Sequence, residues 1–491
     1  MKPLPSKVII IGAGPSGLFA ARRLKEIAKA QNKEIDIVFI EKENVVGGKC
    51  HTYKDPVHPE LRTEEGAGAV APNYGIVIDA LKEHQIKFET MIPVADGTVE
   101  IKELYASLSF KEKLKFDVAI MHEMRQFNNA YNQYKAAVNN KGDLPEELKL
   151  PFSEYCETKG MKYLPIVTKP FVPGFGYGAI THCPTYSVLE YLGKTTIPEI
   201  LMVDNFTQKP SLLAIHDGFQ LLMEKIAAHF DVRLNSEISR VERDAEQVTV
   251  HFKQNGKECV ETGDTLILAT SPKSWPSLGM DMTDVEQQCV NNLEFYRYPV
   301  AVYKVKGLPA HQYYFPPALE AQGFGHLALI TSRDNRDNPS DGRLCTVYVN
   351  LPPGENNFQF DHEAIERELH TIPEVTEVTV VEEKIWEDYM STLPWELRLA
   401  LQREQGSTNT QYLGSHALGG FEDVACVANV ATSAMNEAYT PTSEIKTSFS
   451  TKLGRLNYFF NNHPYSPLKT LDDTTVNDAA SSAAQSAVSM Q

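Results

Sequence analysis

The chain is long, acidic and ordinary in its hydrophobic content. Its 491 residues exceed what one simple hydrophobic core needs, so two or three domains are expected. A hydrophobic share of 42% excludes global disorder, and a net charge of −17 disfavours nucleic acid or an anionic membrane as the main partner. Seven scattered cysteines without a C-x-x-C pair indicate free thiols in a reducing compartment.

Targeting and membrane signals are weak. The first apolar run is too short for a signal peptide, and no run approaches the ~20 apolar residues of a spanning helix. We therefore expect a cytoplasmic protein without an integral membrane segment. Histidines occur without i, i+4 ligand pairs, so no metal site is predicted.

The chain opens with a pattern typical of a nucleotide-binding βαβ unit. Residues 8–11 form an apolar run, as in a parallel strand covered on both faces. Gly12, Gly14 and Gly17 follow in G-x-G-x-x-G spacing, which allows a tight turn, close approach of a pyrophosphate and close helix packing. A helix is predicted over residues 15–30, with its positive N-terminus facing the phosphates.

The next strand supplies an acid for the nucleotide ribose. Residues 35–40 are predicted as a strand that ends in Glu41, whose carboxylate can accept hydrogen bonds from both ribose hydroxyls. The same charge would repel a 2′-phosphate, so FAD or NAD is favoured over NADP. Gly47, Gly48 and Lys49 then favour a flavin, because two adjacent glycines let backbone run close beside the cofactor.

A long helical stripe follows a small-residue segment at 64–73 and a predicted helix at 74–84. Between residues 101 and 141 apolar residues recur at helical spacing, which predicts a helix that packs one face into a core. The alternative is a lipid-facing or partner-facing surface. The stripe consists of Phe110, Leu114, Phe116, Ile120, Met124, Phe127 and Tyr131.

Residues 170–178 predict a shaped loop that presents aromatic side chains. Two prolines and three glycines in nine residues exclude a regular helix or a central strand. In an extended loop Phe175 and Tyr177 would lie on one side, either along a substrate site or in the core, and both interpretations stay open.

The rest of the chain alternates between sheet-like and helical patterns. We predict a helix from Phe219 to about 230, strands at 232–234, 240–242, 248–252 and 265–270, and further strands at 300–306, 326–331 and 345–350. A strand at Tyr412 leads through glycines to a helix from about Val424. The predicted class is α/β: a discontinuous Rossmann-like FAD-binding domain (1–85, 205–290, 405–462), an α+β substrate domain (86–204, 291–404) and a disordered tail (467–491).

Taken in order, these motifs resemble the flavin amine oxidase superfamily, and more closely its FAD-dependent polyunsaturated fatty acid double-bond isomerases. The segments that carry the resemblance are 8–17, 46–51 (Val-Gly-Gly-Lys-Cys-His), 150–155, 170–178 and 419–424. The chain departs from the pattern at Ser415, where an acid is common, and at 88–97, where the isomerases place a carboxylate-binding arginine and this chain has no arginine or lysine.

The resemblance implies a set of site residues. Gly66 and Ala67 would face the isoalloxazine, Ile238 would meet the adenine, and Val424 would open a helix whose dipole faces the flavin. Phe175 and Tyr177 would line the substrate, and Lys304 would match a lysine aimed at the flavin, although a surface lysine is the commoner fate. The cofactor set is Gly12, Gly14, Pro15, Ser16, Gly17, Glu41, Lys42, Gly48, Lys49, Gly66, Ala67, Ile238, Gly414, Ser415, Phe421, Asp423 and Val424.

The expected function is FAD-dependent hydride transfer on a small apolar substrate of unsaturated fatty-acid type, as an oxidoreductase or a double-bond isomerase. An FAD-dependent amine or amino-acid oxidase is the first alternative, and a non-catalytic flavin-binding scaffold is the second. Cys50 is interpreted as a packed thiol rather than a nucleophile.

Overall fold

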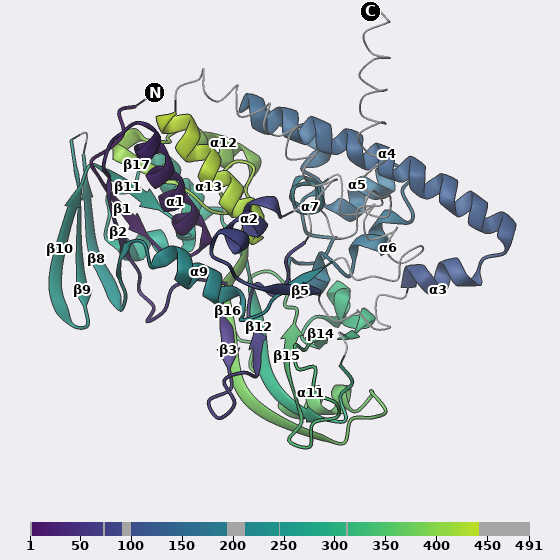
Figure 1. Cartoon of the computed structure of the whole chain (residues 1–491). Helices are drawn as coiled ribbons and strands as arrows, with labels where there is room; N and C mark the ends of the chain where they lie inside the picture. Colours follow the sequence, from purple (N-terminus) through teal and green to yellow (C-terminus); the bar gives the residue numbers. More distant parts are fainter. Residues whose placement is uncertain are drawn as a thin grey trace, which may run out of the picture. The chain divides into compact units, whose positions relative to one another are not determined.

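The computed structural model describes residues 2–71, 74–90, 100–193, 212–244, 246–310 and 313–440 (Figure 1). The chain divides into two units, residues 4–434 and residues 1–3 with 435–491. In the second unit the backbone N–H of Lys2 donates to the carbonyl of Ala438, 3.1 Å away. Every described strand lies in the unit of residues 4–434. The predicted tail at 467–491 lies outside the described residues.

A five-stranded parallel sheet joins the start, middle and end of this unit. Its order is β17-β11-β1-β2-β7, and all neighbouring strands pair in parallel. The apolar runs of β1 and β11 are buried as predicted for parallel strands covered on both faces. The α/β class is therefore confirmed. The strands are β1 (Lys7–Ile11), β2 (Asp36–Ile40), β7 (Asp231–Arg233), β11 (Thr265–Leu268) and β17 (Thr410–Tyr412).

The helix α1 (Pro15–Ala30) has the predicted bounds, and local signals define its start. Gly12 adopts a φ of +98°, which favours glycine in the turn after β1. A Cβ on Gly17 would lie 2.5 Å from the carbonyl oxygen of Gly12, so only glycine lets the helix pack this closely. Other helices of this region are α2 (Gly75–Glu83), α9 (Phe219–Ala227), α10 (Asp284–Asn291), α12 (Trp395–Arg403) and α13 (Val424–Tyr439).

Two larger antiparallel sheets and two short antiparallel pairs complete the β structure of the described residues. A three-stranded sheet contains β8 (Ser236–Arg243), β9 (Val248–Gln254) and β10 (Lys257–Gly263). A five-stranded sheet has the order β13-β14-β15-β12-β16. Its strands are β12 (Glu294–Lys306), β13 (Tyr313–Tyr314), β14 (Leu327–Thr331), β15 (Arg343–Val349) and β16 (Glu377–Thr392), with α11 (His362–Leu369) nearby in sequence. Short pairs are β3 (Thr52–Lys54) with β4 (Arg62–Glu64), and β5 (Phe88–Thr90) with β6 (Leu213–Ile215).

The predicted helical stretch at 101–141 is two helices, α3 (Glu100–Ser107) and α4 (Phe110–Asn140), the long helix of Figure 1. Ser109 separates them: its backbone N–H donates to the Glu112 carboxylate over 2.9 Å, which caps α4. Phe116, Ile120 and Phe127 are buried, as expected for a core face. Phe110 and Leu114 are exposed, so their assignment to that face is wrong. Further helices are α5 (Phe152–Thr158), α6 (Leu164–Thr168) and α7 (Thr185–Leu192).

Among the described residues, no helix is both long enough and apolar enough to cross a membrane.

Candidate cofactor and substrate site

A cavity of about 800 Å³ is walled by residues from the five-stranded parallel sheet region, from β16 and from the segment 414–427. Most residues predicted for the site line it: Gly12, Gly14, Pro15, Ser16, Glu41, Lys42, Gly48, Lys49, Gly66, Ala67, Phe175, Tyr177, Ile238, Gly414, Ser415, Asp423 and Val424. Gly17 and Phe421 instead pack behind the wall, and Lys304 lies elsewhere.

One end of the cavity is shaped for a phosphate group. A Cβ on Gly48 would lie 3.3 Å from the Cα of Gly14, so two bare backbones face each other there. All of α1 is described, and it begins with neither a side-chain cap nor an acid in its first turn. Its free N–H groups and positive dipole end therefore face a narrow slot that suits a pyrophosphate.

Glu41 is held beside this slot by backbone donors. Its Oε2 accepts from the N–H of Ala13 over 2.7 Å, and its Oε1 accepts from the N–H of Glu43 over 2.9 Å. Burial raises the pKa of this carboxyl, although the two backbone hydrogen bonds oppose the shift. Each oxygen keeps lone-pair capacity, so the fixed carboxylate can also accept from ribose hydroxyls.

A polar network lies where the chain departs from the family pattern at Ser415. The Ser415 hydroxyl donates to Oε1 of Glu422 over 2.5 Å, and Ser391 donates to the same oxygen over 3.0 Å. Lys49 Nζ lies 3.0 Å from the other carboxylate oxygen, Oε2 of Glu422. Glu422 thus places a carboxylate beside Ser415 and neutralises the Lys49 charge.

Arg398 on α12 holds the turn that follows β17, and sequence reasoning missed it. Its Nη1 donates to the carbonyls of Ser415, Ala417 and Gly420 over 2.6, 3.0 and 3.2 Å. The side chain is 2% exposed. Burial of an arginine is stabilised here by carbonyl acceptors rather than by an acid, and these contacts fix the wall segment between Gly414 and Asp423.

Two buried polar atoms on the cavity wall support a bound cofactor. Of the buried side-chain atoms without a hydrogen-bond partner in the described part of the chain, Oγ1 of Thr270 and Nε2 of His416 belong to residues that line this cavity. Burial, with Arg398 and Lys49 nearby, lowers the pKa of His416 to about 3, so its imidazole is neutral. Unpaired buried polar groups are rare in proteins, and a cofactor with polar edges would satisfy both. The cavity therefore fits FAD.

The other end of the cavity is aromatic. Phe175 ends a short 3-10 helix at Pro173–Phe175, and Gly176 and Gly178 adopt positive φ of +78° and +85°. The loop is thus tightly turned rather than extended, yet both rings line the cavity. A Cβ on Gly176 would lie 2.5 Å from the ring of Tyr298, so glycine is required where the loop crosses β12.

Tyr177 is the centre of a ring cluster. Its ring centroid lies 4.7 Å from that of Tyr191, 6.0 Å from that of Tyr389 and 4.8 Å from that of Phe421. The side chain lines the cavity and is also buried, so it contributes to packing as well. Further aromatic rings on the cavity wall are Tyr74, Phe171, Tyr191, Trp386 and Tyr389.

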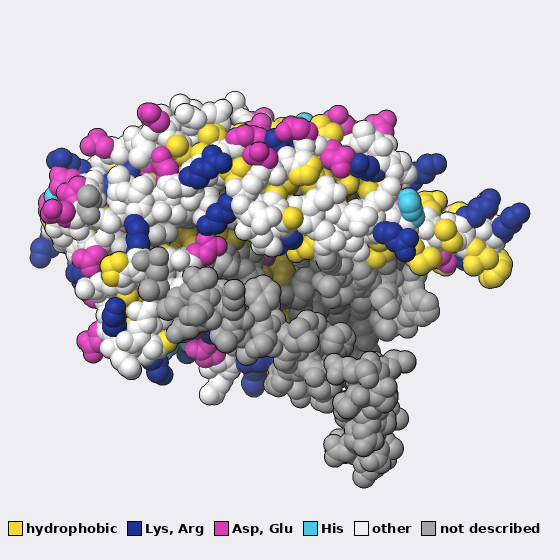
Figure 2. All heavy atoms as spheres, turned by 90° about the horizontal axis from the view of Figure 1, so that it is seen from above, with side chains coloured by type: hydrophobic (Ala, Val, Ile, Leu, Met, Phe, Trp, Pro, Cys, Tyr) yellow, Lys and Arg dark blue, Asp and Glu magenta, His cyan; other side chains and the backbone are white. Residues whose placement is uncertain are grey.

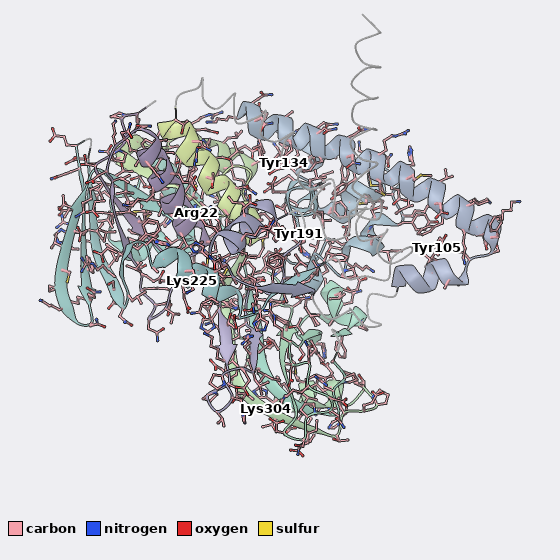
Figure 3. The ribbon with its side chains drawn as sticks, viewed as in Figure 1. Arg22, Tyr105, Tyr134, Tyr191, Lys225 and Lys304 are labelled. Atoms are coloured by element: carbon pink, nitrogen blue, oxygen red, sulfur yellow. The ribbon has the colours of Figure 1, made fainter. Side chains whose placement is uncertain are left out.

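The structure does not bring Lys304 to the cavity, which corrects its assignment as catalytic. Its Nζ forms an ion pair with Oδ2 of Asp55 over 2.7 Å. Figure 3 shows Lys304 far from Tyr191, which lines the cavity. Lys304 lies on a strand, β12, as expected. Its side chain, however, pairs with the buried Asp55, which the sequence alone could not place beside it. Cys50 is 1% exposed, and burial raises the pKa of its thiol well above the usual value, which confirms a packed thiol.

Asp423 is the N-terminal cap of α13 and also part of the wall. Its Oδ1 accepts from the N–H of Cys426 over 2.8 Å. Burial, with the carboxylates of Glu190 and Glu422 nearby, raises the pKa of this carboxyl to about 7. Val424 and Val427 of the first turn also line the cavity, so the positive end of the α13 dipole lies at its wall.

A chamber of about 30 Å³ extends beside the aromatic end and contains an arginine that is already paired. Its lining shares Gly66, Phe175 and Tyr389 with the main cavity. Arg333 lines it, but Nη1 lies 2.9 Å from Oε1 of Glu64 and donates to the carbonyl of Ile215 over 2.7 Å. Residues 91–97 of the segment expected to hold a carboxylate anchor lie outside the described residues.

The cavity combines a dinucleotide slot with an aromatic end, an arrangement that fits a flavin nucleotide. The sequence model of the flavin containing amine oxidoreductase family matches residues 15–279. That stretch is more than half of the chain, and the chain belongs to this family. The expected FAD cofactor and the predicted family resemblance are confirmed.

Two curated relatives are distant in sequence. "FAD-dependent oxidoreductase pigF" of Monascus ruber is 24% identical over 63% of this chain and 64% of its own. "Beta-cyclopiazonate dehydrogenase" of Aspergillus flavus is 22% identical over 62% of this chain and 63% of its own. The match thus spans slightly under two thirds of the length of these relatives.

Solved structures confirm the fold. The CLA-producing fatty acid isomerase from P. acnes superposes with a TM-score of 0.72 at 22% identity, over 90% of this chain and 100% of its own. Putrescine oxidase bound to putrescine superposes with a TM-score of 0.61 at 14% identity, over 88% of this chain and 98% of its own. At these identities the likeness concerns the fold alone.

Proposed function

We propose that the protein is an FAD-dependent oxidoreductase or double-bond isomerase that acts on a small apolar substrate, with unsaturated fatty acids as the substrate class. The observation that carries this proposal is the aromatic end of the cavity, where Phe175, Tyr177 and Tyr389 form a wall continuous with the cofactor slot. An apolar chain between aromatic rings is stabilised by burial and held in few orientations.

The protein residues have positioning and electrostatic roles in this proposal. FAD supplies the two-electron chemistry at carbon–hydrogen bonds. Phe175 and Tyr177 exclude water and hold the reacting carbon, because transfer requires a fixed, close approach. The first turn of α13 stabilises negative charge at the wall of the slot through its dipole. Lys304 has no role in this scheme, since Asp55 binds it away from the cavity.

We also propose the domain division expected from the sequence: FAD binding by 1–85, 205–290 and 405–462, and substrate binding by 86–204 and 291–404. The parallel sheet draws its strands from the first set, which supports this division. A cytoplasmic location belongs to the same proposal.

An FAD-dependent amine oxidase is the second candidate, because a carboxyl lies beside the aromatic rings. Asp423, Tyr177 and Tyr191 line the same cavity, and tyrosine rings with a nearby carboxylate can hold an ammonium group. The pKa of about 7 favours the first candidate, since Asp423 is then only partly ionised at neutral pH and gives a weakened counter-charge.

The test is anaerobic mixing of the holoprotein with a panel of unsaturated fatty acids and of primary amines. We follow flavin absorbance at millisecond resolution and the double-bond position of the products. Bleaching or bond migration with fatty acids alone supports the proposal. Bleaching with amines alone supports the oxidase, and no reaction with any member of the panel supports a scaffold that keeps FAD without turnover.

A further inference from the structure

The outer face of α4 carries a row of exposed apolar side chains near its start. Phe110 is 80% exposed, Leu114 52%, Val118 63% and Met121 61%. A single exposed apolar residue is ordinary, but four on one helix face form a contiguous patch. We call these four residues the α4 outer face.

The outer face is not needed for packing of the helix. At about 100° per residue the four positions fall within roughly 80° of the circumference and span about 17 Å. The buried side chains of Phe116, Ile120 and Phe127 lie on the other side. There the ring of Phe116 contacts those of Tyr105 and Tyr163, with centroids 5.3 and 4.4 Å apart, and Figure 3 labels Tyr105 at this end of α4. Helix α4 thus has two apolar faces, and within the described part of the chain only one of them is buried.

Basic residues flank the outer face although the whole chain is acidic. Residues 110–125 contain four basic and three acidic side chains, whereas the chain carries a net charge of −17. One of the three acids, Glu123, is buried and accepts backbone N–H groups of residues 162–164. Lys111, Lys115 and Arg125 are exposed. Figure 2 shows hydrophobic and basic side chains together at the right-hand end, where α4 begins.

We propose that the α4 outer face docks on the surface of an anionic lipid membrane. Phe110 and Leu114 would enter the boundary between head groups and acyl chains, while Lys111 and Lys115 would contact anionic head groups. A stripe about 17 Å long and 10 Å wide covers on the order of 200 Å², whereas a stable dimer buries about 800 Å² on each partner. The size and the flanking charge therefore favour a lipid surface over a second copy of the chain. This inference does not rest on the proposed function.

Vesicle flotation of the full-length holoprotein tests the proposal. We expect binding to vesicles of phosphatidylcholine with 30 mol% phosphatidylglycerol, and at least tenfold weaker binding to pure phosphatidylcholine, because Lys111 and Lys115 each contribute about 1 kcal/mol at an anionic surface. Raising the salt to 0.5 M should weaken binding, because charge attraction is screened. Absence of binding to the anionic vesicles overturns the proposal.

Matched variants separate the contributions of apolar contact and of charge attraction to vesicle binding. Phe110→Gln with Leu114→Gln should reduce affinity at least tenfold on anionic vesicles, and Lys111→Gln with Lys115→Gln should remove the preference for them. The control is Val57→Gln with Val260→Gln, which alters apolar side chains that are 75% and 58% exposed elsewhere, and it should bind as wild type. Equal binding by the Phe110/Leu114 variant overturns the proposal. So does light scattering that shows a lipid-free dimer which this variant converts to a monomer.

Discussion

At Gly14 and Gly17 the same residue type serves two different purposes. A Cβ on Gly14 has no neighbour nearer than the Cα of Gly48 at 3.8 Å, and its φ of −83° suits any residue. A Cβ on Gly17 would clash with the carbonyl oxygen of Gly12 at 2.5 Å. Gly14 thus leaves room for a ligand, and Gly17 leaves room for the protein itself.

The first prediction concerns this pair. Gly14→Ala should abolish most FAD retention. The free energy of unfolding of the apoprotein should change by only about 1 kcal/mol, the cost of placing alanine at a helix N-cap. Gly17→Ala should destabilise the apoprotein strongly, because backbone must move. The measurements are flavin released by acid per mole of protein and thermal melting of apoprotein. Normal flavin content in Gly14→Ala would show that this turn does not bind the phosphates.

The second prediction distinguishes the two aromatic residues of the loop. Phe175 is half-buried, whereas Tyr177 is buried among three other rings. Phe175→Ala should slow flavin bleaching by substrate and leave stability nearly unchanged. Tyr177→Ala should also lower stability by ~3 kcal/mol because it leaves a cavity. Stopped-flow reduction and thermal melting measure the two effects, and wild-type bleaching by Phe175→Ala would remove Phe175 from the substrate wall.

The third prediction concerns Asp55 and Lys304. Burial opposes ionisation of Asp55, but hydrogen bonds from Lys304 and from the N–H groups of His58 and Val57 outweigh it and lower the pKa to about 2. The lowered pKa contributes stability that is present above the unfolded value of 3.8 and is lost as the pH falls through about 2. Lys304→Met should therefore destabilise the protein at pH 7, and the difference from wild type should fade between pH 4 and 2.

Thermal melting across pH, with flavin reduction at pH 7, measures this effect. Lys306→Met is the control, because its ion pair with Glu377 is 40% and 57% exposed and contributes little. Slower flavin reduction in Lys304→Met alone would return this lysine to the catalytic site.

At the scale of elements, the turn after β17 depends on α12 through Arg398. The fourth prediction is that Arg398→Leu lowers both FAD retention and melting temperature, because three carbonyls lose their donor and the cavity wall loosens. Arg403→Leu on the exposed side of the same helix is the control and should retain FAD. Flavin content and melting are measured on both variants. Full FAD retention by a destabilised Arg398→Leu would limit the role of Arg398 to stability.

Elements with strong local signals could be predicted from the sequence, and elements set by tertiary contacts could not. Helix α1 was predicted to the residue because glycines and a proline define its start. Strand β16 was missed, because most of its residues before Tyr389 are half-buried or exposed and rich in acids, so no alternation marks it. The stripe on α4 merged two faces, since apolar periodicity alone does not tell which face is covered.

The residues of the candidate site also fall into those set by local sequence and those set by tertiary contacts. The phosphate slot and Glu41 are encoded within one short stretch, so their positions follow from spacing. Arg398, His416 and Glu422 were missed because their roles arise from contacts with residues that fold beside them. Lys304 was misplaced because Asp55, far away in the sequence, binds it.

At the scale of the whole molecule, the parallel sheet makes the FAD site depend on distant parts of the chain. The fifth prediction is that deletion from Thr410 onward abolishes FAD binding, because β17 and the wall from Gly414 to Val427 are removed. Deletion from Pro467 onward is the control and should bind FAD normally, as expected for a polar, small-residue tail. Titration of each apoprotein with FAD, followed by flavin fluorescence, gives the affinities. Near-normal affinity without residues 410–491 would contradict the discontinuous site.

Because β17 lies late in the chain, the parallel sheet is completed late in synthesis. Strand β11 pairs with β1 on one side and with β17 on the other, yet β17 begins only at Thr410. At 5–20 residues per second, a ribosome needs about 7–28 s to make the stretch of roughly 140 residues between the end of β11 and the start of β17. Throughout this interval the nascent chain has an unpaired edge at β11, which is prone to join other strands. FAD can bind a complete slot only after β17 and the wall up to Val427 have been made, and the supply of FAD then competes with aggregation for each newly made chain.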